Sequence, residues 1–239
     1  MRNEHKYFLL AAIFIGIFST LSYIVANTKV EIGPLKDKGT ALLNSGKYNE
    51  SIAYFDKALT IHPNDVNTLT QKGLALIFLN KPNQSISYFD KALTIHPNDV
   101  NTLTQKGLAL GRLGKYNESI SYFDKALAIN PKFGIAIKEK ENSVSAIAAE
   151  TNAINKGIAL LGLGKYNESI AYFDKALTIN PSDVMALNSK GLALYRLGEY
   201  NGSISYFNKA LAINRNLIIA TKEKEATIAG AAHNITKNR

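Results

Sequence analysis

The chain has 239 residues, 46% of them hydrophobic, which is long enough for one or two domains and too apolar for a disordered chain. It contains no Cys, so a disulfide framework, a thiolate metal site and a thiol nucleophile are excluded. Lys and Arg outnumber Asp and Glu by 28 to 19, but the excess is spread along the chain and forms no basic stripe with aromatic residues, which argues against nucleic acid as a partner.

The chain opens with an apolar segment. Residues 7–26 carry no charge and follow a basic flank, residues 1–6. A helix of this length rises about 30 Å and matches a bilayer core, whereas the apolar run of a secretory signal is shorter. We therefore expect a single-pass transmembrane helix or signal anchor here, with the N-terminus inside and the rest of the chain outside. The alternative is a secreted chain, cleaved after one of the imperfect small-residue sites at 20–22 and 24–26. A third possibility, a helix buried in a protein core, is disfavoured because the segment is apolar on every side.

A repeat organises the remainder of the chain. The 21 residues 56–76 recur unchanged as 90–110, and a Lys-Gly dipeptide recurs at spacings of 34, 34, 50 and 34 residues. Such a fixed period is typical of a repeat architecture. The dipeptides are Lys38-Gly39, Lys72-Gly73, Lys106-Gly107, Lys156-Gly157 and Lys190-Gly191.

Each repeat is predicted to form two helices. In the second copy, Leu69, Gly73 and Leu76 are three and four residues apart, the spacing of one helical face. A Gly, or Asn80 in this copy, then ends the first helix where a left-handed backbone costs little, and Pro97 stops the second helix. An Asn stands where the N-cap of each second helix is expected: Asn49, Asn83, Asn117, Asn167 and Asn201.

This pattern resembles the tetratricopeptide repeat. The match covers residues 32–217 in five copies, although Lys replaces the family's usual Leu before each Gly and Arg215 replaces the last Pro. The resemblance implies an all-α fold, an α-solenoid of five helix-turn-helix repeats. From the flanking segments we expect two Lys/Glu-rich capping helices and the one N-terminal transmembrane helix in addition. We expect each of these Lys residues to lay its stem along the groove and to raise its ammonium group to water.

A larger duplication is superimposed on the repeats. Residues 134–149 resemble residues 218–232, which lie 84 positions later. Because a solenoid covers its last apolar face with a more polar element, two such elements indicate two stacked modules. The expected organisation is repeats one to three at 32–133, a capping element at 134–149, repeats four and five at 150–217, and a C-terminal capping helix at 218–239.

The first capping element is expected to be fused to the helix that follows it. No Gly or Pro lies between Ala136 and Lys156, so turn chemistry is missing there. We therefore predict one long helix over 134–163. An ordinary turn near Asn142 or Asn152 is the alternative.

Catalytic and cofactor sites are not indicated. His62 and His96 occupy equivalent places in successive repeats, about 10 Å apart by helix packing, and a metal ion needs ligands at about 2 Å. Gly164-Lys165 is followed by Tyr166 and no strand precedes it, so it does not match a phosphate-binding loop. Because each polar group recurs in near-identical copies without a nucleophile–base pair, we expect no enzyme activity, no cofactor and no metal.

The resemblance implies a concave surface, lined by the first helix of each repeat, that holds a peptide from a partner. Amides such as Gln71, Gln105 and Asn155 are suited to bonding a peptide backbone. The residue types that form binding hot spots are found at Phe78, Arg112, Tyr195 and Arg196. The alternative is a solvated concave face without an occupant. The predicted groove residues are Asn67, Thr70, Gln71, Leu74, Phe78, Asn101, Thr104, Gln105, Leu108, Arg112, Ile154, Asn155, Ile158, Asn188, Tyr195 and Arg196.

One recognition mode of the family is not expected. Chaperone-binding members resemble one another in an Asn directly after the Gly, which forms part of a clamp for a C-terminal carboxylate. In this chain that position holds Thr40, Leu74, Leu108, Ile158 and Leu192.

The Lys residues before the Gly positions form a series that would favour acidic partners unless neighbouring Asp residues neutralise it. The members expected to form this series are Lys72, Lys106, Lys156 and Lys190.

Six Asn-x-Ser/Thr triplets are candidate N-glycosylation sites of an exported chain. Five of them also have a structural explanation, as an N-cap Asn followed two residues later by a small Ser at the helix crossing. The six Asn residues are Asn49, Asn83, Asn117, Asn167, Asn201 and Asn234.

Taken together, these patterns predict a membrane-anchored, non-catalytic scaffold that binds a protein or peptide partner in its concave groove. The alternative is a secreted or cell-surface structural protein that self-associates through its repeats.

Overall fold

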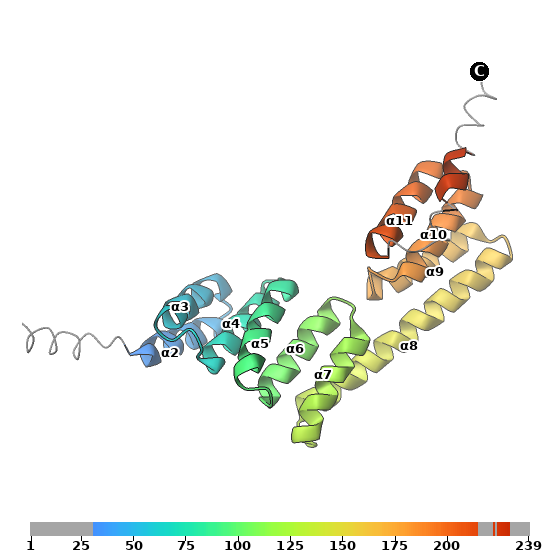
Figure 1. Ribbon diagram of the computed structural model, residues 1–239. Helices are drawn as coiled ribbons and strands as arrows, with labels where there is room; N and C mark the ends of the chain where they lie inside the picture. Colours follow the sequence, from blue (N-terminus) through green and yellow to red (C-terminus); the bar gives the residue numbers. More distant parts are fainter. Residues whose placement is uncertain (1–30, 215–221, 223, 230–239) are drawn as a thin grey trace, which may run out of the picture.

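The computed structural model describes residues 31–214, 222 and 224–229, and over these residues the chain is a solenoid of antiparallel helix pairs (Figure 1). The predicted all-α repeat fold is confirmed for this part of the chain. No helix in it has both the length and the apolarity to cross a membrane, and the predicted anchor, residues 7–26, lies outside it. The helices are α2 (Ile32–Asn44), α3 (Tyr48–Ile61), α4 (Val66–Phe78), α5 (Pro82–Ile95), α6 (Val100–Arg112), α7 (Tyr116–Ile129), α8 (Gly134–Gly162), α9 (Tyr166–Ile179), α10 (Val184–Arg196) and α11 (Tyr200–Ile213).

The first helix of a pair ends as the sequence predicts, on a residue with a left-handed backbone. Gly46 has φ 77° after α2, and its N–H bonds to the carbonyl of Leu43 while the N–H of Lys47 bonds to that of Leu42. This pair of reversed bonds satisfies carbonyls that the helix leaves open. The equivalent residue after α4 is Asn80, with φ 57°.

The predicted N-caps of the second helices are wrong. α3 begins at Tyr48, so Asn49 is its second residue, and the cap position is Lys47, which makes no side-chain cap bond. The carbonyl of Lys47 already accepts from the N–H of Ser51 at 2.9 Å. The helix therefore begins directly after the reversed turn, two residues too early for Asn49 to cap it. The same shift applies to Asn83, Asn117, Asn167 and Asn201.

Within each pair the two helices pack closely because Gly faces Phe. A Cβ atom on Gly73 of α4 would lie 2.4 Å from the ring of Phe89, which is fully buried in α5. In the first pair, the Ser51 hydroxyl donates to the carbonyl of Gly39 at 2.8 Å. The repeated Gly and Ser are therefore the residues that set the distance between paired helices.

α8 is a single helix of 29 residues, Gly134–Gly162, where the sequence predicts a fused helix over 134–163. Its length is about 43 Å at 1.5 Å per residue. Its first half packs on α7, with Ala136 against Phe123, and its second half packs on α9 and α10. Lys140 also pairs with Asp124 of α7 at 2.6 Å. α8 thus serves as the last helix of one stack and the first helix of the next.

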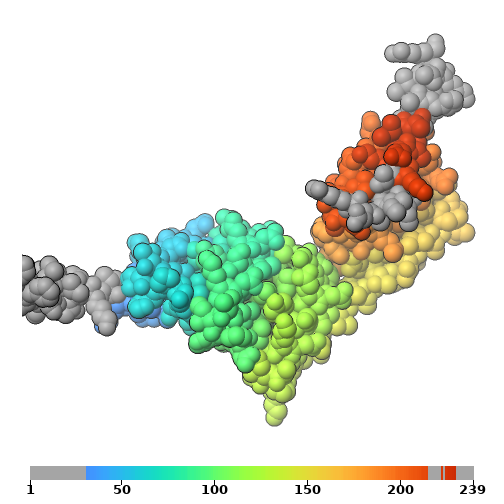
Figure 2. Space-filling model, viewed as in Figure 1, coloured from blue at the N-terminus to red at the C-terminus, as the bar shows by residue number. Residues whose placement is uncertain are grey.

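The chain therefore forms two stacks of helices, one on each half of α8, and its direction changes at this helix (Figures 1 and 2). The stacks meet beside the middle of the helix. The Tyr116 hydroxyl of α7 donates to the carbonyl of Ile179 in α9 at 3.0 Å, and Asn180 donates to the buried carboxylate of Glu150 at 2.9 Å. Of the predicted C-terminal cap, 218–239, the residues 224–229 are helical and the rest lies largely outside the described residues.

Candidate functional site

A polar pocket lies between α4 and α6 in the first stack. Its volume is about 690 Å³, and it is lined by the N-terminal halves of these helices and by the loops that precede them. Because α4 and α6 are the first helices of successive repeats, residues 34 positions apart meet across it. Six of the predicted groove residues line it: Asn67, Thr70, Gln71, Leu74, Asn101 and Gln105.

Sequence reasoning missed the loop side of the pocket. The two loops contribute Asp65 and Asp99, each of which caps the following helix by accepting from a backbone N–H three residues later. The Asn-Asp-Val triplet that recurs 34 positions apart is the signal that could have identified these residues. The full set missed is Asn64, Asp65, Val66, His96 and Asp99.

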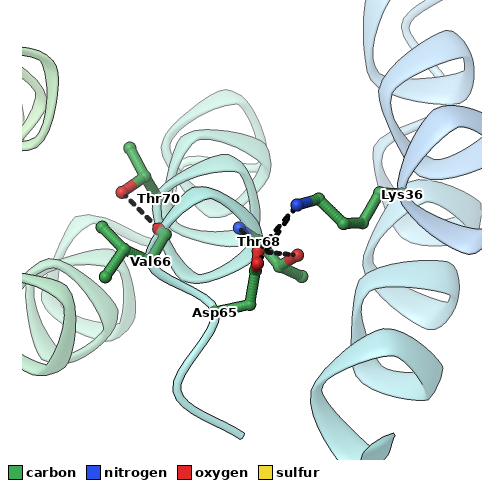
Figure 3. Close-up of polar contacts among 5 residues, drawn as sticks. All are labelled: Lys36, Asp65, Val66, Thr68 and Thr70. Carbon is green, nitrogen blue, oxygen red and sulfur yellow. Dashed lines mark hydrogen bonds and ion pairs between the residues drawn. The ribbon is translucent and has the colours of Figure 1, made fainter. Parts of the chain in front are cut away.

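Asp65 is held by several donors, as Figure 3 shows. Lys36 of α2 points to it with Nζ 3.1 Å from both carboxylate oxygens. Thr68 donates to Oδ1 from its backbone N–H at 2.8 Å and from its hydroxyl at 2.6 Å. Burial raises the pKa of Asp65, but the bonds from Thr68 and Lys36 outweigh it and the pKa is lowered. This carboxylate is therefore charged and fully engaged within the protein.

Thr70 is on the other side of α4 and is also engaged. Its hydroxyl lies 2.9 Å from the carbonyl of Val66, and 2.6 Å from the hydroxyl of Thr102 in α6. The Thr70–Thr102 contact joins α4 to α6 directly. It fixes the separation of the two walls of the pocket.

Gln105 presents an acceptor without a donor. Its Oε1 atom is buried and has no hydrogen-bond partner among the residues that the structure describes. A buried acceptor without a partner costs about 1–3 kcal/mol. The same is true of Oδ1 of Asn188 in the second stack. Of these two residues, Gln105 is the one that lines the pocket between α4 and α6.

Two predicted groove residues are corrected by their burial. Thr104 is 1% exposed, because α8 follows α6 in the stack, and its hydroxyl bonds to the carbonyl of Val100. Ile154 is 7% exposed and packs with Ala176 and Ala186, because this face of α8 turns toward α9 and α10. Neither side chain is available to a partner.

The other predicted groove residues lie outside the pocket. Phe78, at the end of α4, is 48% exposed and stacks on the ring of Tyr48 at 4.9 Å. Leu108 packs beside the buried Leu103 and Phe123. Arg112, Asn155, Ile158 and Arg196 are exposed, whereas Asn188 and Tyr195 are half-buried.

Three of the Lys residues before the Gly positions, Lys72, Lys106 and Lys190, are bonded within the protein rather than raised to water. Nζ of Lys72 donates to Asp56 of the preceding repeat and, at 2.6 Å, to the hydroxyl of Tyr88. Burial lowers the pKa of Lys72, but these two bonds outweigh it and the pKa is raised. Lys106 and Lys190 make the same pair of bonds. At these three positions an Asp occupies the place that an acidic partner would take.

Lys156 departs from this arrangement. The residue sixteen positions before it is Lys140, so the Asp of the other repeats is replaced by a cation. Nζ of Lys156 lies 5.2 Å from the centre of the Tyr172 ring, and the side chain is exposed. The predicted Lys series is thus interrupted where the two stacks join.

Within residues 31–214, 222 and 224–229, no group of His, Asp and Glu residues is arranged to hold a metal ion. His96 lines the pocket, whereas His62 does not.

These features define a helical repeat protein with a polar pocket on two neighbouring first helices. Three family models match the chain, each described as the tetratricopeptide repeat, at residues 37–65 and 66–99, at 100–133 and at 154–217. Together they cover well over half of the sequence. The chain belongs to the tetratricopeptide repeat family.

The solved structures to which this chain is similar have low sequence identity to it. The Sgt2 TPR domain from Aspergillus fumigatus is 19% identical, with 52% of this chain and 83% of that chain covered and a TM-score of 0.49. The TPR2AB-domain:pHSP90 complex of yeast Sti1 is 18% identical, with 86% of each chain covered and a TM-score of 0.43. MamA protein is 22% identical, with 77% of this chain and 92% of that chain covered and a TM-score of 0.41. None of the curated proteins compared matches the chain.

Proposed function

We propose that this protein is a non-catalytic scaffold that binds a peptide segment of a partner protein in the pocket between α4 and α6. The observation that carries the proposal is the buried Oε1 atom of Gln105, which has no donor among the described residues and belongs to a pocket in which five of the eleven lining side chains are amides. A buried amide oxygen of this kind is stabilised when a ligand donates to it.

An extended peptide fits the chemistry of this pocket. Its backbone offers an N–H and a C=O at each residue, and an Asn or Gln side chain both donates and accepts. Gln71 and Gln105 stand on adjacent helices at equivalent places, so one extended segment can bond to both. Phe78, Arg112, Tyr195 and Arg196 stay predicted hot spots outside the pocket.

The test is partner capture on the tagged full-length chain from a detergent extract of its native membranes. Gln71→Ala combined with Gln105→Ala removes two amides from the pocket and should eliminate the specifically captured proteins. Gln84→Ala, on an exposed site of α5 outside the pocket, is the matched control and should leave the captured set intact. An unchanged set in the double variant would refute the proposed binding site.

We further propose that residues 7–26 anchor the scaffold in a membrane, with the repeats outside. Support comes from the uncharged length of the segment and its basic flank. Washing membranes with alkaline carbonate distinguishes this from secretion after signal cleavage. An anchored protein stays in the pellet, and release into the supernatant would contradict the anchor.

Glycosylation of the exported chain is a related proposal. Asn49, Asn83, Asn117, Asn167 and Asn201 are all exposed, which leaves their amides open to a glycan. The triplet Ser is buried; Ser51, for example, bonds to Gly39. Modification would therefore precede folding. Treatment with a glycosidase that removes N-linked glycans should increase gel mobility, and an unchanged mobility would contradict occupancy. Asn234 lies outside the described residues.

A specific observation also supports self-association as a second function. Leu127, Ile137 and Val144 line an apolar depression of about 410 Å³ between α7 and α8, and Val144 is 50% exposed. This is the face of α8 on which the second helix of a complete repeat would pack. A charge there, as in Val144→Asp, should shift a dimer to monomer in sedimentation, and a wild-type chain that is monomeric at tens of micromolar would exclude this function.

A further inference from the structure

The two carboxylates that line the pocket have different surroundings, although their local sequences are identical. Asp65 and Asp99 stand at the same place in the repeated segments 56–76 and 90–110. Asp65 receives two bonds from Thr68 and an ion pair from Lys36. Within the described residues, the carboxylate of Asp99 accepts one hydrogen bond, from the backbone N–H of Thr102 at 2.7 Å, and it forms no ion pair.

The difference comes from the residue on the preceding helix. Lys36 of α2 supplies the cation for Asp65 (Figure 3), and the residue 34 positions later is Thr70 of α4. Thr70 carries no charge, and its hydroxyl draws the hydroxyl of Thr102 toward itself at 2.6 Å. Thr102 is the counterpart of Thr68, which bonds to Asp65. Asp99 therefore lacks both the ammonium group and the hydroxyl that Asp65 has.

The pocket leaves the charge of Asp99 without an opposite charge. Its lining has no Lys and no Arg in the described part of the chain, and His96 is its one basic side chain. Asp99 is half-buried, so its carboxylate is less screened than a fully exposed one. On the same helix, Oε1 of Gln105 is a second acceptor without a donor. A cationic group that carries N–H donors would be attracted to the carboxylate of Asp99, whereas a ligand carboxylate would be repelled.

We infer that the pocket selects a cationic side chain, Lys or Arg, which binds the carboxylate of Asp99 in the way that Lys36 binds Asp65. This inference rests on the proposed peptide-binding function and states the chemistry of the peptide. The amides of the pocket bond the peptide backbone, and Asp99 selects the charged residue. The preference is opposite to that of a clamp for a carboxylate.

The test uses three labelled libraries of short peptides, fixed at the central position as Lys, Gln or Glu and randomised elsewhere without Cys. Each library is passed over the immobilised full-length chain, and the retained fraction is measured. The Lys library should be retained about tenfold more than the Gln library, which is the magnitude expected when a charge-assisted hydrogen bond replaces a neutral one. The Glu library should be retained least.

Two variants address Asp99 independently. Asp99→Asn removes the charge but keeps a good N-cap for α6, so the preference for Lys should disappear while the Gln library is still retained. Thr70→Lys places an ammonium group where Lys36 stands relative to Asp65, and it should also abolish the preference. Asp183→Asn makes the same change in the cap of α10, outside the pocket, and should preserve the preference.

The outcomes separate this inference from the function on which it rests. If wild-type protein retains none of the libraries, peptide binding in the pocket is refuted. If it retains all three equally, or Glu most, the cation inference is overturned and peptide binding stands. A preference for Lys that persists in both Asp99→Asn and Thr70→Lys would also overturn the assignment to Asp99.

Discussion

Two Gly residues of α6 should respond in opposite ways to the same substitution. A Cβ atom on Gly107 would lie 2.6 Å from Cε1 of Phe123, whose side chain is 1% exposed and has no room to move. At Gly111, one turn later, the nearest atom is Oγ of Ser119 at 3.4 Å, an ordinary contact distance. Both residues are helical, so both gain helix propensity when replaced by Ala.

The magnitudes follow from these distances. Overpacking a filled core costs about 1–3 kcal/mol, and replacing Gly by Ala in a helix recovers about 0.5–1 kcal/mol. We expect Gly107→Ala to destabilise the α6–α7 pair by about 1–2 kcal/mol and Gly111→Ala to stabilise it by about 0.5–1 kcal/mol. Phe123→Leu should partly rescue Gly107→Ala, because the two side chains compete for the same space.

The assay is native-state hydrogen exchange on the full-length chain. Because repeats unfold in partly independent units, the amides of α6 and α7 report the local change, and those of α10 and α11 serve as an internal reference. If both Gly variants slow exchange, the close approach of Gly107 to Phe123 does not control packing. If both accelerate it, helix propensity has been misjudged at Gly111.

Three further substitutions test the polar contacts. Lys72→Met should lower the free energy of unfolding by about 1 kcal/mol, because it removes the bonds of Lys72 to Asp56 and Tyr88. The pKa of Lys72 is raised above 10.5, so the difference from wild type in urea unfolding should persist at pH 9. It should vanish as the pH rises through that raised pKa. Asp65→Ala should lower the free energy of unfolding by about 0.5–2 kcal/mol through loss of the helix cap. Because the pKa of Asp65 is lowered, wild type should be the more stable protein above pH 3.8 and should lose this difference as the pH falls through the lowered pKa. A stability difference that persists at lower pH would contradict the assignment. Burial raises the pKa of Glu150, so the stability of the wild-type protein should increase as the pH falls from 7 toward 4.5. Glu150→Gln should raise the thermal midpoint at pH 7 and should make stability less dependent on pH. A lowered midpoint would mean that the charge itself holds the two stacks together.

Much of the fold could be predicted because its determinants are local. The period of 34 residues, the left-handed ends at Gly46 and Asn80, and the lack of a turn residue between Ala136 and Lys156 are all readable along the chain. Each acts through backbone preferences or through contacts between residues close in sequence. Even here the N-cap prediction at Asn49 failed by two residues, because the reversed turn and the following helix share Lys47.

The candidate site could be predicted in part. Gln71 and Gln105 line one pocket because equivalent positions on successive first helices face the same side of a solenoid, and the period of the sequence is enough to predict this. Thr104 and Ile154 were misplaced because their exposure depends on how α8 packs. A helix shared by two stacks turns successive faces toward different neighbours, and no periodicity in the sequence reveals which face each half buries.

The sequence by itself therefore determined the repeat and its paired helices, and it predicted a set of residues for the concave face. Only the tertiary structure decided which of these residues are free to bind. Segments 56–76 and 90–110 have the same sequence, yet Asp65 is paired and Asp99 is not, and Thr70 is half-buried while Thr104 is buried. The physical reason is that burial and ion pairing depend on the helices on either side, and these neighbours differ even where the repeated residues are identical.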